Sequence, residues 1–280
     1  MTLVEFDISS TNNLQHRLVL KRMTFLIIGS VLIISSIIIF SESHDRYPLI
    51  LWALNITGAF ASILGIVAIC RHGLSGNHGK SYLFLTLGLI SWFSADVTLT
   101  YYYVLFGIEE QKLVSFTDFL WAVGYIFLSS HLIIIVKELG ERIRSKTLIL
   151  PALATFTFIL YETITIISNG SSRISDFVAF VVTMAYPILD MSLMIPSIII
   201  LLHVRKDYEH SIPWFLSSLS LLVNAIADDG YVHDFVGGNS QNFWIWDLFY
   251  IADFIVMAAA LFWYNRYHIS RTVSIKKNML

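Results

Sequence analysis

The sequence predicts an all-α integral membrane protein, a polytopic helical bundle with eight transmembrane helices. Hydrophobic residues make up 56% of the 280 residues and charged residues only 14%, and the mean hydropathy is +0.70. An average soluble domain has about 25% charged residues, and a soluble chain of this length cannot bury so much apolar surface. A disordered chain is also excluded, because disorder goes with a polar, highly charged composition.

The predicted spans follow one another along the chain and form a single membrane domain over residues 1–280. A span needs about 20 mostly apolar residues, and the segments that qualify are 24–40, 47–70, 81–107, 115–137, 148–168, 176–203, 211–236 and 243–266. They are continuous apolar runs, which excludes the alternating strands of a membrane β-barrel. The loops between them are short, so we expect no kinase, cyclase or other output domain outside the membrane.

Features of individual spans agree with this assignment. The first span follows Arg17, Lys21 and Arg22 as a signal peptide would, but it ends in Ser-Glu-Ser-His-Asp without a small-residue cleavage site. We therefore interpret it as an uncleaved span. Glycine occurs within the second, third and fourth spans, which membrane helices tolerate. Pro187 is expected to kink the sixth span and to free a backbone carbonyl near Asp190.

The distribution of lysine and arginine predicts the orientation. Positive residues are enriched in short cytoplasmic loops, and fifteen of the 18 Lys and Arg residues fall on one side of the predicted spans. The other side holds only Arg46, Lys112 and Arg173. Because the number of spans is even, both termini are predicted to be cytoplasmic, in a multi-pass protein of the plasma membrane.

Several partners and cofactors have no support in the sequence. The single cysteine, Cys70, excludes an internal disulfide and a cysteine-based metal centre. The net charge of −2 gives no argument for nucleic-acid binding. The last spans contain no lysine to hold retinal, so a microbial rhodopsin is rejected. Carboxylates suit hard cations such as Mg²⁺ or Ca²⁺, but no ligand spacing demands a metal, and the cofactor stays unknown.

Acidic residues inside the predicted spans are the main functional signal. A charged side chain near the bilayer centre costs about 2.5–3.5 kcal/mol, and no Lys or Arg lies at that depth to pair with one. The acids are therefore expected to face the bundle interior or water, either protonated, sharing a bound cation, or hydrogen-bonded to Tyr, Thr, Asn and water. All lie at mid-depth or in the outer half: Asp96, Asp118, Glu162, Asp190, Asp228, Asp229, Asp247 and Asp253.

The deeper acids are predicted to line a polar cavity that opens to the outer side. These are Asp96, Asp190, Asp228 and Asp253. Asp229 is about 100° around the helix from Asp228, so it borders the same cavity or points towards the headgroups.

Four other residues near the spans have more than one interpretation. Asp118 and Asp247 are close to the outer interface, as Glu162 could also be, and there they line the cavity, act as helix N-caps or face solvent. His131 in the fourth span is either a hydrogen-bonded core residue or a ligand.

Two parts of the chain resemble each other. Leu-Ile-Ser-Trp-Phe-Ser-Ala-Asp (89–96) is similar to Leu-Leu-Val-Asn-Ala-Ile-Ala-Asp (221–228), and residues 117–127 are similar to 246–256. Asp96 then corresponds to Asp228. Because both pairs of spans run in the same direction, we expect a parallel repeat of spans 3–4 and 7–8, related by an axis along the membrane normal.

The same residues resemble the lysoplasmalogenase-like family of eight-span membrane enzymes. Ala95-Asp96 stands where the family has Gly-Asp, Phe127 and His131 follow, Ala227-Asp228 stands at the Ser-Asp position, and Tyr250 with Asp253 occupies the last helix. The resemblance implies hydrolysis of a vinyl-ether lysolipid.

The chemistry of that reaction fits a pair of intramembrane carboxyls. One is a neutral general acid and the other orients water. We expect Asp96 and Asp228 to be this catalytic pair. Lining residues of the cavity are expected to be Asp190, Asp253, Asp229, His131, Tyr250 and Tyr186.

A second resemblance is to multi-span sensory modules found ahead of diguanylate cyclases and histidine kinases. Ser115-Phe116-Thr117-Asp118 leads to Gly124-Tyr125, and Tyr186-Pro187 leads to Asp190. The chain would then be a stand-alone sensory or ligand-binding module that signals through a separate partner. A proton- or cation-coupled transporter is less favoured, because no inverted repeat and no paired broken helices are present.

Overall fold

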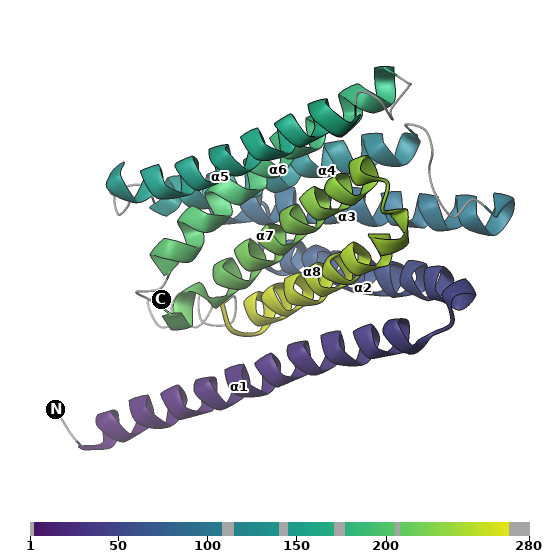
Figure 1. Ribbon diagram of the computed structural model, residues 1–280. Helices are drawn as coiled ribbons and strands as arrows, with labels where there is room; N and C mark the ends of the chain where they lie inside the picture. Colours follow the sequence, from purple (N-terminus) through teal and green to yellow (C-terminus); the bar gives the residue numbers. More distant parts are fainter. Residues whose placement is uncertain (1–2, 108–114, 140–144, 171–176, 205–207, 269–280) are drawn as a thin grey trace.

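The computed structural model describes residues 3–107, 115–139, 145–170, 177–204 and 208–268, and within these residues the chain is helical with no strand (Figure 1). The elements in order are α1 (Leu3–Phe40), α2 (Ser43–His72), α3 (Gly76–Phe106), α4 (Phe116–Leu139), α5 (Ser145–Thr165), the π-helical turn η2 (Ile166–Gly170), α6 (Phe177–Val204), α7 (Tyr208–Gly237), the 3₁₀ turn η3 (Ser240–Asn242), α8 (Phe243–Trp263) and the π-helical turn η4 (Tyr264–His268).

Eight of these helices are long and apolar enough to cross a membrane, which confirms the predicted number of spans. The helices are longer than the predicted apolar segments at most of their ends. The largest difference is at α1, which begins at Leu3 although its apolar part covers only 18–40. Hydropathy detects the part of a helix that suits lipid, whereas the hydrogen-bonded backbone continues past it.

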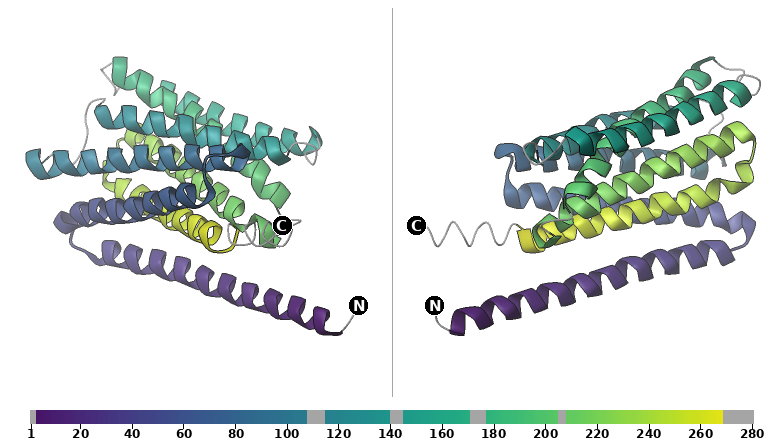
Figure 2. Two further views of the ribbon diagram at one scale, coloured as in Figure 1. Left: turned by 180° about the vertical axis from the view of Figure 1, so that it is seen from behind. Right: turned by 60° about the vertical axis from the view of Figure 1, so that its left-hand side comes forward.

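The helices are arranged as two tight pairs joined by single helices (Figure 2). α3 packs along α4, and α7 packs along α8. α2 lies against α3 and α8, α6 bridges α4 and α7, and α5 covers α6. α1 runs along the opposite side of the bundle from α5, and its main contacts are with α8 and α2. α7 is therefore central and α1 peripheral.

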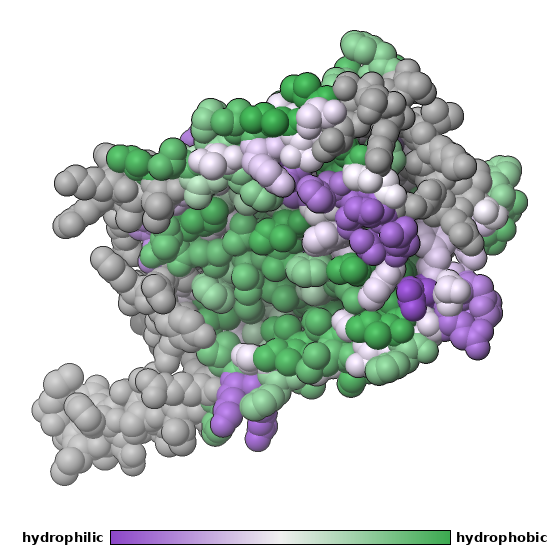
Figure 3. Space-filling model, viewed as in Figure 1, coloured by the Kyte–Doolittle hydropathy of each residue, from purple (hydrophilic) through white to green (hydrophobic). Residues whose placement is uncertain are grey.

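Burial differs between these helices in the same way. Of the 18 most apolar consecutive residues in each helix, 56% are buried in α7 but only 11% in α1. Large apolar side chains such as Phe25, Trp52, Ile126 and Ile188 point out of the bundle. Figure 3 shows the broad hydrophobic surface that results, with hydrophilic residues gathered towards the end where α1 meets α2. Such a surface suits contact with lipid tails rather than water.

Glycines let the paired helices approach each other closely. A Cβ atom on Gly124 of α4 would lie 2.1 Å from Trp92 Cδ1 of α3, and one on Gly230 of α7 would lie 2.4 Å from the Trp246 ring of α8. In both pairs an indole ring occupies the space that a side chain would need. Small residues at such contacts are a general feature of membrane helix packing, where close van der Waals contact drives association.

Candidate intramembrane site

A hydrogen-bonded cluster of acids and phenols joins four helices in the bundle interior. The Tyr125 hydroxyl of α4 contacts the carboxyl groups of both Asp190 of α6 and Asp228 of α7. Tyr250 of α8 donates to Asp228 Oδ1 at 2.5 Å. Asp190 is fully buried and Tyr125 is 2% exposed, whereas Asp228 is half-buried. We call Tyr125, Asp190, Asp228 and Tyr250 the tyrosine–aspartate cluster.

The number of protons available constrains the charge of this cluster. A neutral phenol has one O–H group to donate, yet Tyr125 contacts an oxygen of each of two carboxyl groups. That single proton can form a full hydrogen bond with one of the carboxyls, and a proton on the other carboxyl would let it donate in turn to the phenol oxygen. The ion pairs within the described residues involve His44 and His78, which lie near helix ends and supply no cation to this cluster. A shared proton is the simplest way to hold Asp190 and Asp228 together.

A second contact joins α4 and α6 nearer to the start of each helix. Tyr186 of α6 donates to Asp118 Oδ1 of α4 at 3.0 Å. Asp118 Oδ2 accepts the backbone N–H of Ser115 at 2.9 Å, which is the reciprocal part of a capping box at the start of a helix. Asp118 therefore stabilises the first turn of α4 by accepting the Ser115 N–H, and it also contacts a tyrosine of α6.

Asp253 lies beside the cluster but has its own donors. It is 1% exposed in α8 and accepts the hydroxyl of Ser220 and a hydrogen bond from Asn224, both on α7. Asp228 is close enough to Asp253 for their carboxyl groups to interact electrostatically. Asp253 is thus a satisfied acid at the α7–α8 interface, next to the cluster.

Asp96 is placed between α3 and α4. Its carboxyl group is hydrogen-bonded by the indole of Trp121, and its acidic neighbours are Asp247 and Asp253. The expected catalytic partner, Asp228, instead contacts Tyr125 and Tyr250. The hydrogen-bond partners of Asp96 and Asp228 therefore differ, and Asp253 is the acid that both have as a neighbour.

His131 is held at the α3–α4 interface. Its Nδ1 atom lies 2.8 Å from Ser81 Oγ and 3.0 Å from the Ser81 carbonyl oxygen, and its ring meets Tyr82 edge to face. The side chain is fully buried. These contacts are those of a hydrogen-bonded core histidine.

Asp229 and Glu162 form a separate acidic group between α7 and α5. Each is 3% exposed, and the two carboxyl groups are electrostatic neighbours. Both oxygens of Asp229 and the Oε2 atom of Glu162 are buried without a hydrogen-bond partner. His233, an exposed residue one turn further along α7, is a neighbour of Glu162.

The residue that sequence reasoning did not select is Tyr125. It follows Asp118 by seven residues, two turns of α4, so both lie on one helix face towards α6. Ser220, Asn224 and Asp228 share a face of α7 in the same way, at intervals of four. This spacing of polar residues within an apolar helix was the available signal.

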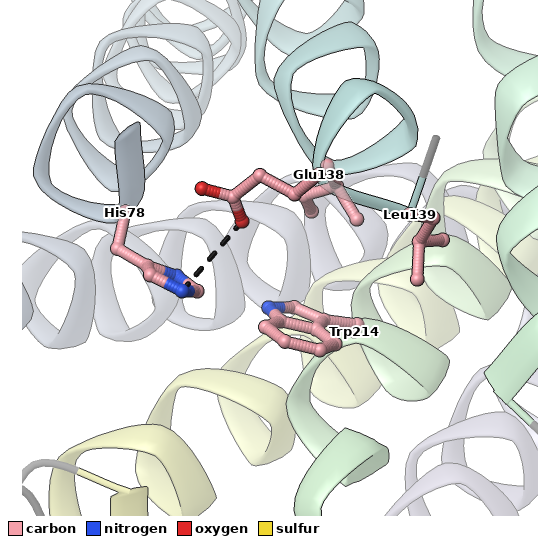
Figure 4. A pocket seen from close by; sticks show the side chains of 5 residues that line it. His78, Glu138, Leu139 and Trp214 are labelled. Carbon is pink, nitrogen blue, oxygen red and sulfur yellow. Dashed lines mark ion pairs between the residues drawn. The ribbon is translucent and has the colours of Figure 1, made fainter. Parts of the chain in front are cut away.

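A pocket of about 300 Å³ lies at the other end of the bundle, where α3 and α7 begin and α4 ends. Figure 4 shows its polar residues, with His78 Nε2 3.6 Å from Glu138 Oε2 and the Trp214 ring below them. The ring of His78 stacks on that of Trp214. Ile135 and Leu139 complete the lining. The pocket is distinct from the tyrosine–aspartate cluster.

No group of three or more His, Cys, Asp or Glu side chains within the described residues is arranged to hold a metal ion. The fold and the site together define a multi-pass membrane protein with an acid cluster in its interior. Comparison with known protein families, characterised proteins and solved structures gives no match to the chain.

Proposed function

We propose that the chain is a membrane-embedded sensory module whose tyrosine–aspartate cluster responds to a proton or a cationic ligand and which signals through a separate partner. The observation that carries this proposal is a crossed pair of contacts between α4 and α6. Tyr125 of α4 contacts Asp190 of α6, and Tyr186 of α6 contacts Asp118 of α4. All four residues belong to the segments that resemble sensory modules.

The cluster links its own charge to the position of helices. If the shared proton leaves, Asp190 and Asp228 become two like charges in a low-dielectric interior, where repulsion is far stronger than in water. Those residues are on α6 and α7, and their common partner is on α4. A change in proton or cation occupancy thus favours a different spacing of these helices, which is the kind of two-state element a sensor needs.

The signal would be passed on at the positively charged end of the bundle. We propose that this end, which carries fifteen of the 18 Lys and Arg residues and both termini, is cytoplasmic in the plasma membrane. The pocket lined by His78, Glu138 and Trp214 lies at this end. Membrane lipids surround the spans, and the signalling partner would contact the charged end.

We further propose that α3–α4 and α7–α8 are parallel repeats. One contact is equivalent in the two pairs, although Asp228 also contacts Tyr125. Asp96 is bonded by Trp121 in the first pair, and Asp228 is bonded by Tyr250 in the second, at matching positions of the two sequences. Both pairs are also the most closely packed in the bundle. These contacts support the repeat.

The sensory proposal is tested by a probe far from the cluster. Cys70, the single cysteine, is exposed in the last turn of α2, near the charged end. An environment-sensitive fluorophore on Cys70 should change its emission as pH is varied on the purified protein. Tyr125→Phe should remove that change, while Tyr101→Phe, at an exposed tyrosine, should keep it. An identical response in both variants would contradict the proposal.

A second candidate is a lysoplasmalogenase-like hydrolase of vinyl-ether lipids. The observation in its favour is that Asp228 is half-buried and contacts the same phenol as the buried Asp190. A carboxyl group held neutral in such a pair would supply the acid that protonation of the enol ether needs. The purified protein would be incubated with lysolipids, including vinyl-ether forms, and fatty aldehyde followed by mass spectrometry. Aldehyde release that is lost in Asp228→Asn and Asp96→Asn would favour the enzyme over the sensor.

A further inference from the structure

Asp229 of α7 and Glu162 of α5 form a second acidic group, outside the tyrosine–aspartate cluster. Asp229 lies eight residues before the end of α7, and Glu162 eight residues before the end of η2, so both are about 12 Å below the same end of the bundle. Each side chain is 3% exposed. The two carboxyl groups therefore lie at a similar depth inside the protein, close enough to interact electrostatically.

Three carboxylate oxygens in this group are buried and have no hydrogen-bond partner. They are Asp229 Oδ1, Asp229 Oδ2 and Glu162 Oε2. Buried polar atoms are nearly always paired, because an unpaired one costs about 1–3 kcal/mol. Other acids at similar depth have donors: Tyr250 for Asp228, and Ser220 for Asp253. Asp190 Oδ2 is also buried without a partner, but the other oxygen of Asp190 accepts from Tyr125, whereas neither oxygen of Asp229 has a donor.

We propose that the space between Asp229 and Glu162 binds a primary ammonium group, either of a free amine or of a lipid headgroup. A primary ammonium has three N–H donors, which equals the number of unpartnered acceptors. Its charge is opposite to that of both carboxylates. Charge-assisted hydrogen bonds of this kind are about twice as strong as neutral ones.

A directly coordinated metal fits this site less well. The described residues hold no group of three or more His, Cys, Asp or Glu side chains arranged for a metal ion. A hard cation bound to two carboxylates would need most of its ligands from water, whereas hydrogen bonds to an ammonium need only the acceptors present. Metal ions are therefore included in the test as competitors.

The inference gives the sensory module a ligand, so its biological meaning rests on that proposed function. Asp229 adjoins Asp228 in sequence and is also an electrostatic neighbour of it. A cation held by Asp229 would change the field at the tyrosine–aspartate cluster. Ammonium binding is measured on the purified protein, without a signalling partner and without a fluorophore on Cys70. The result can therefore contradict the binding site without contradicting the sensory role, and the reverse.

The test measures the thermal unfolding midpoint of the purified full chain in uncharged detergent. Ammonium or methylammonium chloride replaces tetramethylammonium chloride at constant ionic strength. Because tetramethylammonium has the charge but no N–H group, only the first two should raise the midpoint, in a saturable way. Sodium and calcium chloride are run beside them. A rise produced equally by tetramethylammonium, sodium or calcium would overturn the ammonium assignment.

The headgroup source is tested in lipid nanodiscs. Phosphatidylethanolamine carries a primary ammonium, and phosphatidylcholine carries the same charge without N–H donors. A higher unfolding midpoint in phosphatidylethanolamine alone, with no effect of free amines in detergent, assigns the site to the headgroup. An effect of free amines assigns it to a soluble ligand. Absence of both effects overturns the proposal.

The variants Asp229→Asn and Glu162→Gln locate the effect. Each removes a carboxylate charge from the site and should weaken the response at least tenfold in half-saturating concentration. Asp45→Asn and Glu42→Gln, at exposed acids of the α1–α2 turn, are the matched controls and should respond as the unmodified protein does. An undiminished response in Asp229→Asn and Glu162→Gln would also overturn the proposal. Asp229→Asn is expected to fold, because neither oxygen of Asp229 has a partner to lose.

Discussion

The Tyr186 hydroxyl lies 3.0 Å from Asp118 Oδ1, and this bond joins α6 to α4 at the capped start of α4. Two turns further along α4, the direction of the bond reverses, since Tyr125 of α4 contacts Asp190 of α6. Each of the two helices therefore supplies one tyrosine and one aspartate to the contacts that join them.

Removal of the Tyr125 hydroxyl should destabilise the protein. Tyr125→Phe keeps the ring but leaves Asp190 and Asp228 without their common partner, and a buried group left unpaired costs about 1–3 kcal/mol. The thermal unfolding midpoint in detergent should fall. Tyr101→Phe is the control, because that side chain is exposed and should give no change. Equal midpoints for the two variants would show that the contact contributes nothing to stability.

The contact between Tyr186 and Asp118 should appear as a coupling energy. In a double-mutant cycle of Tyr186→Phe and Asp118→Asn, residues in direct contact typically couple by about 0.5–3 kcal/mol. Unfolding in denaturant would be measured for the two single variants and the double variant. Strict additivity of the two single effects would argue against the bond.

A methyl group at Gly124 should disturb the α3–α4 pair. The added Cβ would lie 2.1 Å from Trp92, so Gly124→Ala should lower the unfolding midpoint and alter tryptophan fluorescence. Gly29→Ala provides the comparison, because nothing lies within 4 Å of a Cβ at that position of α1. Alanine favours a helix over glycine by about 0.5–1 kcal/mol, so Gly29→Ala should be neutral or stabilising. A loss of stability of the same size in both would point to helix propensity alone.

Ser220 should stabilise Asp253 inside the membrane. Ser220→Ala removes the hydroxyl donor from a carboxyl group that is 1% exposed. The expected loss is about 1–3 kcal/mol, as for other buried groups that lose a partner. Ser130→Ala should have a much smaller effect, because that hydroxyl binds a carbonyl of its own helix at an exposed position. Chemical unfolding of both variants measures the difference.

The proposed orientation is checked by labelling cysteine from one side. Cys70 should react with a membrane-impermeant maleimide only after the cells are permeabilised, because it lies at the positively charged end. A Cys70→Ser/Ser43→Cys variant places the thiol at the opposite end of α2 and should react in intact cells. Reaction of Cys70 in intact cells would reverse the orientation.

The membrane-spanning helices were largely predictable because a helix that contacts lipid is a long apolar run, and such a run is visible in the sequence. The predicted span 115–137 and helix α4 (Phe116–Leu139) differ by two residues at most at either end. α1 was predictable only in its apolar part, since nothing in hydropathy marks how far a helix continues in water. Five of the eight acids expected within the spans are buried, namely Asp96, Glu162, Asp190, Asp229 and Asp253, and the other three are half-buried. Asp234 is also buried but was not among the expected acids.

The contacts within the site were not predictable to the same degree. Asp190, Asp228 and Tyr250 were expected near one another, but the residue that joins the two acids, Tyr125, was not selected. Whether a tyrosine on α4 meets acids on α6 and α7 depends on the rotation of packed helices, which a single sequence does not specify. The equivalence of Asp96 and Asp228 was visible in the repeat, whereas the different partners of the two acids were not.

The light packing of α1 has a consequence for how the protein is made. Its membrane segment has the highest mean hydropathy of the eight, 2.6, while only 11% of it is buried against the rest of the chain. The insertion of α1 is therefore expected to depend on partitioning into lipid more than on contacts with its neighbours. In the proposed orientation, Arg17, Lys21 and Arg22 would hold the charged flank of α1 on the cytoplasmic side. Helices such as α7, with many polar residues, can be threaded afterwards against partners already in place.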